Sequence, residues 1–190
     1  INRKALVLAA LALAPILGPG AAIAHPGHEL SGLGAGLIHP LLGLDHLLAM
    51  TAVGVWAALQ PAHRAWQAPA LFVAMAAAGA GIGLAGAGLP LVEPGIAASV
   101  VLMGLLIAGA ARVPASASLA LIGGFAVLHG QAHAAEAVAP LGGYVAGFLA
   151  ASAALHAGGY VTGRMLSSTR YGVSVAGFLI TAAGAALALG

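Results

Sequence analysis

Long apolar segments, separated by short stretches rich in glycine, proline and the few charged residues, dominate the chain. After an N-terminal apolar run, six segments follow at approximately residues 31 to 59, 66 to 88, 94 to 111, 115 to 137, 140 to 162 and 172 to 189. A bilayer core about 30 Å thick requires about 20 apolar residues of a spanning helix. Helices also satisfy their own backbone hydrogen bonds in lipid. The pattern predicts an all-α integral membrane protein, a single bundle of six transmembrane helices.

Composition supports this class of protein. Of the 190 residues, 62% are hydrophobic and 5% are charged, whereas soluble domains carry about 25% charged residues. The six lysines and arginines are too scattered for a nucleic-acid surface. Cysteine is absent, which excludes a disulfide framework and a thiolate metal site. Glycine-rich segments such as residues 79 to 88 predict close contacts between helices.

The N-terminal run has the pattern of a secretory signal peptide. Arg3 and Lys4 precede the apolar sequence ALVLAALALAPILG, and the small-residue pattern A-x-A ends at Ala24. We expect residues 1–24 to be a cleavable signal peptide and residues 25–190 to form the transmembrane domain. Cleavage after Ala24 would make His25 the mature N-terminus, and the alternative is an uncleaved signal anchor.

Basic residues predict the orientation of the bundle. Arg64, Arg112, Arg164 and Arg170 all fall in alternate connections, which the positive-inside rule places in the cytoplasm. The mature N-terminus and the C-terminus would then both lie outside, in the periplasm of a bacterial inner membrane. Halves of three helices each would have opposite topologies, which is compatible with an inverted repeat of three plus three helices.

The first apolar segment contains three polar residues, His39, Asp45 and His46, in the sequence HPLLGLDH. An acidic residue near the bilayer centre costs about 2.5 to 3.5 kcal/mol and normally faces a partner or a cavity. On a straight helix His39 and His46 lie about 10 Å apart, and Asp45 points to a different side from His46. Either Pro40 bends the helix so that one ion reaches both histidines, or the segment serves two ion sites.

A matching group follows in the fourth segment, in the sequence HGQAHAAE. His129 and His133 are spaced i, i+4, with Glu136 three residues later, so all three lie on one helix face. Two imidazoles with this spacing can bind one divalent cation. The motif is not the HExxH of zinc proteases, because Gly130 follows His129 and the general-base glutamate is missing.

Other histidines and acids admit both a functional and an ordinary interpretation. Glu93 opens the third segment and could be a solvated helix cap, and His156 in the fifth could be a helix-packing residue. His63, beside Arg64, is expected to be solvated. Imidazole and carboxylate ligands without thiols suit nickel, cobalt or zinc, with no organic cofactor. The candidate metal ligands are His25, His28, His39, Asp45, His46, Glu93, His129, His133, Glu136 and His156.

These motifs resemble those of the HupE/UreJ family of bacterial membrane proteins. The resemblance covers nearly the whole chain: a signal peptide, an AHPGH start, HPxxGxDH from His39 to His46, Glu93, HGxxHxxE from His129 to Glu136, and His156. It implies permeation of Ni(II), or of Co(II), across the inner membrane, and an association with hydrogenase or urease maturation. It does not imply an enzyme.

The leading hypothesis is therefore a metal permease with successive sites of moderate strength. Glu93, Glu136 and His28 would capture the ion, which would pass to His39, His129 and His133, then to Asp45 and His46, and leave by way of His156. Two alternatives stay open. One is a membrane redox protein that uses haem or a metal; the other is a metal-binding accessory or storage protein without translocation.

Overall fold

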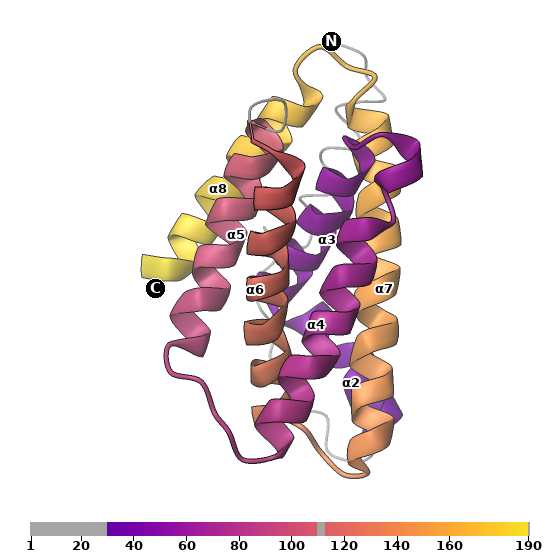
Figure 1. Cartoon of the computed structure of the whole chain (residues 1–190), viewed down its shortest axis with the longest axis vertical. Coiled ribbons are helices and arrows are strands. Elements are labelled where there is room, and N and C mark those ends of the chain that lie inside the picture. Colours follow the sequence, from indigo (N-terminus) through magenta and orange to yellow (C-terminus); the bar gives the residue numbers. More distant parts are fainter. Residues whose placement is uncertain (1–29, 110–112, 190) are drawn as a thin grey trace.

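The computed structural model describes residues 30–109 and 113–189, and within them every regular element is helical (Figure 1). The signal-peptide prediction, together with His25 and His28, lies outside the described residues. The elements are α2 (Leu33–Leu42), α3 (Leu44–Ala58), the short 3-10 helix η1 (Ala62–Arg64), α4 (Gln67–Leu84), α5 (Val92–Ala108), α6 (Ala115–Ala135), α7 (Leu141–Leu166) and α8 (Gly172–Leu189).

Each of the six predicted apolar segments contains a helix, which confirms the all-α prediction for the described residues and is consistent with a bundle of membrane helices. Four helical segments, those that end at Leu84, Ala135, Leu166 and Leu189, are long and apolar enough to cross a membrane, and α2 with α3 would make a fifth. α5 is apolar but has only 17 residues. The total of six spans therefore stays a prediction.

The first predicted segment is not one straight helix. α2 and α3 meet at Gly43 with a bend of 84°. Pro40 lies inside α2, and the helix continues past it for two residues. The turn occurs at Gly43, whose φ of −78° and ψ of 111° are extended, since glycine leaves the helical region at the least cost. The alternative of a straight first helix is therefore wrong. The segment is bent, and the bend is at Gly43 rather than at Pro40.

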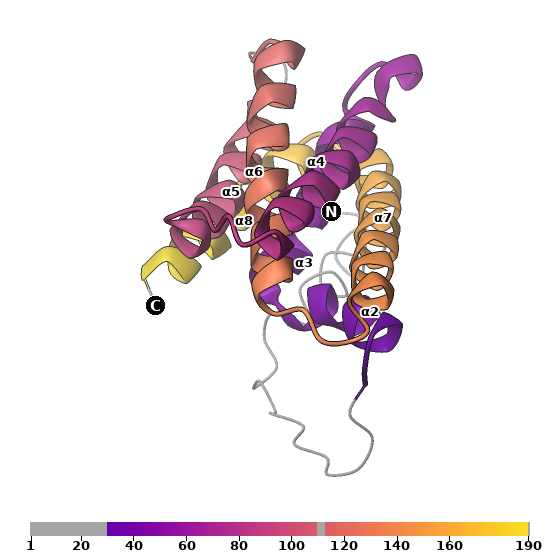
Figure 2. The ribbon, with the colours of Figure 1, turned by 60° about the horizontal axis from the view of Figure 1, so that its bottom comes forward.

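The helices pack in pairs that are distant in sequence. α4 packs against α6, α3 and α2 against α7, and α5 against α8, and both views place α2 beside the beginning of α7 (Figures 1 and 2). A Cβ atom added to an interface glycine would collide with the backbone of the facing helix, as at Gly79 and Gly130 in α4 and α6, Gly54 and Gly159 in α3 and α7, and Gly104 and Gly177 in α5 and α8. These glycines are close-contact positions, as the sequence predicts.

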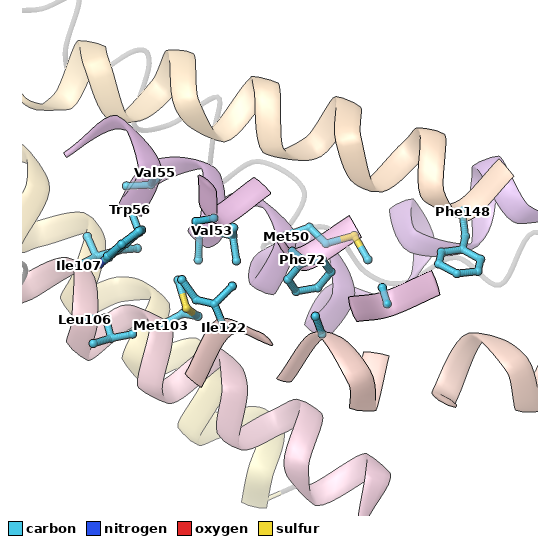
Figure 3. Close-up of a cluster of buried hydrophobic side chains, with 14 of the residues drawn as sticks. Met50, Val53, Val55, Trp56, Phe72, Met103, Leu106, Ile107, Ile122 and Phe148 are labelled. Carbon is cyan, nitrogen blue, oxygen red and sulfur yellow. The ribbon is translucent and has the colours of Figure 1, made fainter. Parts of the chain in front are cut away.

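An apolar core runs between α3, α4, α5, α6 and α7. Trp56 and Ile107 lie at one end of this cluster and Phe148 at the other, with Met50 and Phe72 between them (Figure 3). Phe72 and Phe148 are both almost fully buried. Both face histidines, as does Tyr144 of the same core, so the core and the polar site share a wall.

Candidate metal centre

Three histidines from three helices form a group in which His46 and His133 are buried and His39 is partly exposed. His39 in α2, His46 in α3 and His133 in α6 each offer a ring nitrogen, and these nitrogens all lie within 4.8 Å of one another. The bend at Gly43 makes this possible, because it folds α2 back so that His39 and His46 approach one another despite seven residues of separation. The structure thus places both histidines in one group rather than at two separated positions.

The imidazole rings pack edge to face. The ring centroids of His39 and His46 are 5.7 Å apart, and that of His133 lies 5.0 Å from His39 and 4.7 Å from His46. His129, one helical turn before His133, follows at 4.9 Å from His46. Four histidines predicted from two sequence motifs are therefore brought into contact, with His129 beside the group of three.

Asp45 is a hydrogen-bond partner of His46 and does not point away from it. Its Oδ1 lies 2.8 Å from Nδ1 of His46 and 2.7 Å from the backbone nitrogen of the same residue. The prediction that the two side chains point to different sides is wrong, because Asp45 is in the first turn of α3 and its carboxylate folds onto the next residue. With Nδ1–H donated to Asp45, the lone pair of His46 is on Nε2, which is buried and has no partner within the described residues.

Glu136 holds His39 in a similar way. Its Oε2 lies 2.7 Å from Nε2 of His39, at the C-terminal end of α6. When Nε2–H donates to Glu136, Nδ1 of His39 is the nitrogen free to bind an ion. Carboxylate partners of this kind orient histidine ligands and raise their basicity. Asp45 and Glu136 therefore contact the predicted histidine ligands directly.

Ser99 orients His129 in the same way, although the sequence does not predict this role. Its hydroxyl donates to the carbonyl oxygen of Ile96 at 2.6 Å, and its Oγ lies 3.1 Å from Nε2 of His129. Since the hydroxyl proton is used, His129 Nε2–H is the donor to Ser99. Nδ1 of His129 then carries the lone pair and is buried without a partner in the described chain. A lone serine in an apolar segment gives no signal of such a role.

His133 is oriented by packing instead of by a hydrogen bond. Its ring stacks on Phe148 with centroids 4.3 Å apart and an interplanar angle of 12°. Tyr144 faces both His39 and His133, at 6.1 and 6.5 Å between centroids. Neither ring nitrogen of His133 has a partner among the described residues. Tyr144 and Phe148 are spaced i and i+4 in the fifth apolar segment, and this spacing could have predicted that both aromatic rings line the same side of the site.

Gln131 lies between the two histidines of α6 and was also missed. Its amide NH₂ donates to the carbonyl oxygens of Gly79 at 3.2 Å and Ala87 at 3.1 Å, and its Oε1 accepts from the backbone N–H of Leu89 at 3.2 Å. One buried side chain thus ties α6 to the connection between α4 and α5. Gln131 lies within the predicted metal-binding motif of α6, but its hydrogen bonds connect backbone segments and do not involve a histidine.

The remaining predicted site residues lie apart from the group of three. His156 is separated from His129 by Phe72, whose ring centroid is 5.5 Å from His129 and 4.9 Å from His156. Glu93 is exposed in the first turn of α5. His63 is exposed on η1, as expected.

The chemistry of the group fits a divalent transition-metal ion. Buried imidazole nitrogens without partners are costly in an apolar interior, and together they form the ligand set of borderline metals. Two nitrogens bound tetrahedrally to one ion at about 2.1 Å are about 3.4 Å apart. The nitrogens here are within 4.8 Å, so modest side-chain rotations would bring them to an ion.

Comparison with known proteins assigns the family. Residues 11–187 match the family described as HupE / UreJ protein. The chain is 42% identical over 197 residues to Protein HupE of Rhizobium leguminosarum bv. viciae, an alignment that covers 100% of this chain and 98% of that protein. No solved structure matches the chain. The protein belongs to the HupE/UreJ family.

Proposed function

We propose that this protein is a permease that moves Ni(II), or Co(II), across the bacterial inner membrane into the cytoplasm. The observation that carries the proposal is the group of His39, His46 and His133, the last two of them buried, within a bundle of apolar helices. Ligands of this type suit Ni(II), Co(II) and Zn(II) alike. Nickel is preferred because HupE/UreJ proteins are associated with hydrogenase and urease. Members of this family are accessory and transport proteins of the membrane, and we assign no catalytic activity to the chain.

The direction of transport follows from the charges at the two ends of the bundle. The connections after α3 and α7, which contain Arg64 and Arg170, lie at the same end (Figure 1). The positive-inside rule assigns that end to the cytoplasm, although Arg112 falls outside the described residues. Glu136 would then face the periplasm, together with the mature N-terminus. The C-terminus would face the same side, since it follows one further helix after Arg170.

The contacts between side chains support an order of steps. Glu136 is half exposed and bonded to His39, so it is the natural point of entry. The ion would pass from His39 to the pair of His46 and His133, and then to His129. Each step offers one or two imidazoles, and several sites of moderate strength favour release better than one tight site. Metal delivered in this way would supply hydrogenase or urease maturation.

The pairing of helices also supports the inverted repeat predicted from the sequence. In such a repeat α2 with α3 corresponds to α6, α4 corresponds to α7, and α5 corresponds to α8. Under this exchange the pair of α4 and α6 becomes the pair of α7 and α3, which is also observed, and the pair of α5 and α8 is unchanged. We infer that the two halves are related by an axis in the membrane plane. The group of three histidines draws on the first helix of each half, as expected for a site at the repeat interface.

A haem protein is disfavoured by the packing of the site. The rings of His39, His46, His129 and His133 contact each other directly, with the centroids of successive neighbours 4.7 to 5.0 Å apart. A small ion can bind among them after modest rotations, whereas a macrocycle between two of them would require the helices to separate. A storage protein would share the same ligands, and it differs from a permease only in flux.

Uptake by proteoliposomes tests the proposal. Vesicles that contain the purified protein should accumulate radioactive Ni(II) in the lumen. His46→Ala should abolish that accumulation, because His46 contacts both His133 and His129 and so connects successive positions of the ion. His63→Ala, which removes an exposed histidine outside the group, is the matched control and should transport normally. Metal that stays bound to protein without entering the lumen would identify a storage role. Normal uptake by His46→Ala would exclude the proposed site.

A further inference from the structure

One face of α7 carries a row of buried polar groups beyond the histidine group. Tyr144, Ser152 and His156 are spaced by multiples of four residues with Phe148 among them, so all four side chains lie on one face of the helix. Tyr144 and Phe148 face the histidine group, and His156 faces Phe72. Ser152 is one turn from Phe148 and one turn from His156. It therefore lies between the histidine group and His156.

Ser152 differs from the other buried serines of the described chain. Ser99 and Ser118 each donate their hydroxyl to a backbone carbonyl oxygen of the preceding turn, at 2.6 and 3.4 Å. The Oγ of Ser152 is fully buried and has no partner among the described residues. A buried hydroxyl normally finds a partner, and a serine in a helix has one available in the preceding turn. An oxygen that is left free in this row is available to a ligand.

His156 has the same property. Its side chain is 2% exposed, and neither ring nitrogen has a partner in the described part of the chain. His156 also lines a groove of about 840 Å³ between α4 and α7, with Trp66 and Tyr160 among the other lining residues. The groove extends to η1, at the end of the bundle where Arg64 lies. His156 thus stands between the interior and the proposed cytoplasmic end.

We propose that Ser152 and His156 form a second cation position, on the cytoplasmic side of Phe72. It would bind a divalent transition-metal ion through one hydroxyl oxygen and one imidazole nitrogen, with water as the remaining ligands. Groups at i and i+4 of a helix are close enough to share one ion. Two protein ligands make a weaker site than three histidines, which suits release to the cytoplasm. The inference rests on the proposed function for the arrival of the ion, but the binding site itself can be tested alone.

The absence of cysteine from the chain allows a spectroscopic test. Ser152→Cys replaces the hydroxyl by a thiol of similar size, and Co(II) bound to a thiolate gives a near-ultraviolet charge-transfer band that imidazole ligands do not give. Purified Ser152→Cys should develop this band when Co(II) is added. Ser118→Cys, a second fully buried serine on α6 that is bonded to Pro114, is the matched control and should not. Adding His156→Ala to Ser152→Cys should weaken Co(II) binding in the band titration at least tenfold.

The outcomes separate this site from the transport proposal. A correctly folded Ser152→Cys protein without the band would overturn the second site, and so would a band that is unchanged by His156→Ala. Neither result would touch the uptake of Ni(II) by the wild-type protein. Conversely, a band that depends on His156 would establish the site even in a protein that accumulates no metal. Where uptake is observed, Cd(II) should block it at a lower concentration in Ser152→Cys than in the wild type, because Cd(II) prefers thiolate ligands.

Discussion

The carboxylate of Asp45 accepts a hydrogen bond from Nδ1 of His46, with 2.8 Å between the two atoms. This contact fixes the tautomer of His46, so that its lone pair is on Nε2, the atom buried beside His133 and His129. A negative charge at Nδ1 also makes Nε2 a better donor to a cation. In the proposed site Asp45 would therefore stabilise an ion bound by His46 without contacting it.

Asp45→Asn should weaken metal binding about 10- to 100-fold, the usual effect of losing such a partner. The amide preserves the size of the side chain but removes the charge that supports His46. Titration of the purified protein with Ni(II) or Co(II), followed by calorimetry, measures the change. Elution and helix content should match the wild type, so that the loss reports binding and not unfolding. An unchanged dissociation constant would mean that Asp45 has no influence on the ion.

Gly43→Ala tests the break between α2 and α3. The backbone conformation there suits alanine as well as glycine, but an added Cβ would lie 3.0 Å from Oδ1 of Asp45 and 3.2 Å from Nδ1 of His46. Both groups must shift, so metal affinity should fall at least about tenfold, the scale of disturbing a histidine partner, while the bundle still folds. Gly124→Ala in α6, where an added Cβ meets nothing within 4 Å, is the control. Equal affinity in the two variants would argue against a role for the break in shaping the site.

How far the sequence predicts the site depends on what each residue contacts. His39, His46, His129 and His133 could be identified because apolar helices make any histidine conspicuous, and their motifs fix the spacing. The place where these four histidines meet could not be predicted, because it depends on the 84° bend. That bend is at Gly43, whereas Pro40 is the stronger sequence signal for a bend. Ser99 and Ser152 carry no signal at all, since serine in an apolar helix usually bonds to its own backbone.

Gly159→Ala should destabilise the contact between α3 and α7. An added Cβ would collide with the carbonyl oxygen of Thr51 and crowd Gly54, and overpacking of this kind costs about 1 to 3 kcal/mol. Gly158→Ala is the adjacent control on the same helix, because an added Cβ there meets nothing within 4 Å. Thermal unfolding in detergent should show a lower midpoint only for Gly159→Ala. Alanine raises helix propensity at both positions, so a similar loss in both variants would mean that the effect does not come from the close approach at Gly159.

Transport should depend on pH through the histidines. Only a neutral imidazole binds a metal ion, and histidine in water has a pKa of about 6.5. Protons therefore compete with the ion for the ligand nitrogens, and uptake should fall as pH decreases. Proteoliposomes with the same pH on both sides, assayed from about pH 7.5 to about pH 5.5, one unit either side of the histidine value, isolate this competition from any proton gradient. Since several histidines share one ion, the decrease should be steeper than a single titration. A rate that stays constant over this range would contradict the predicted competition between protons and the ion.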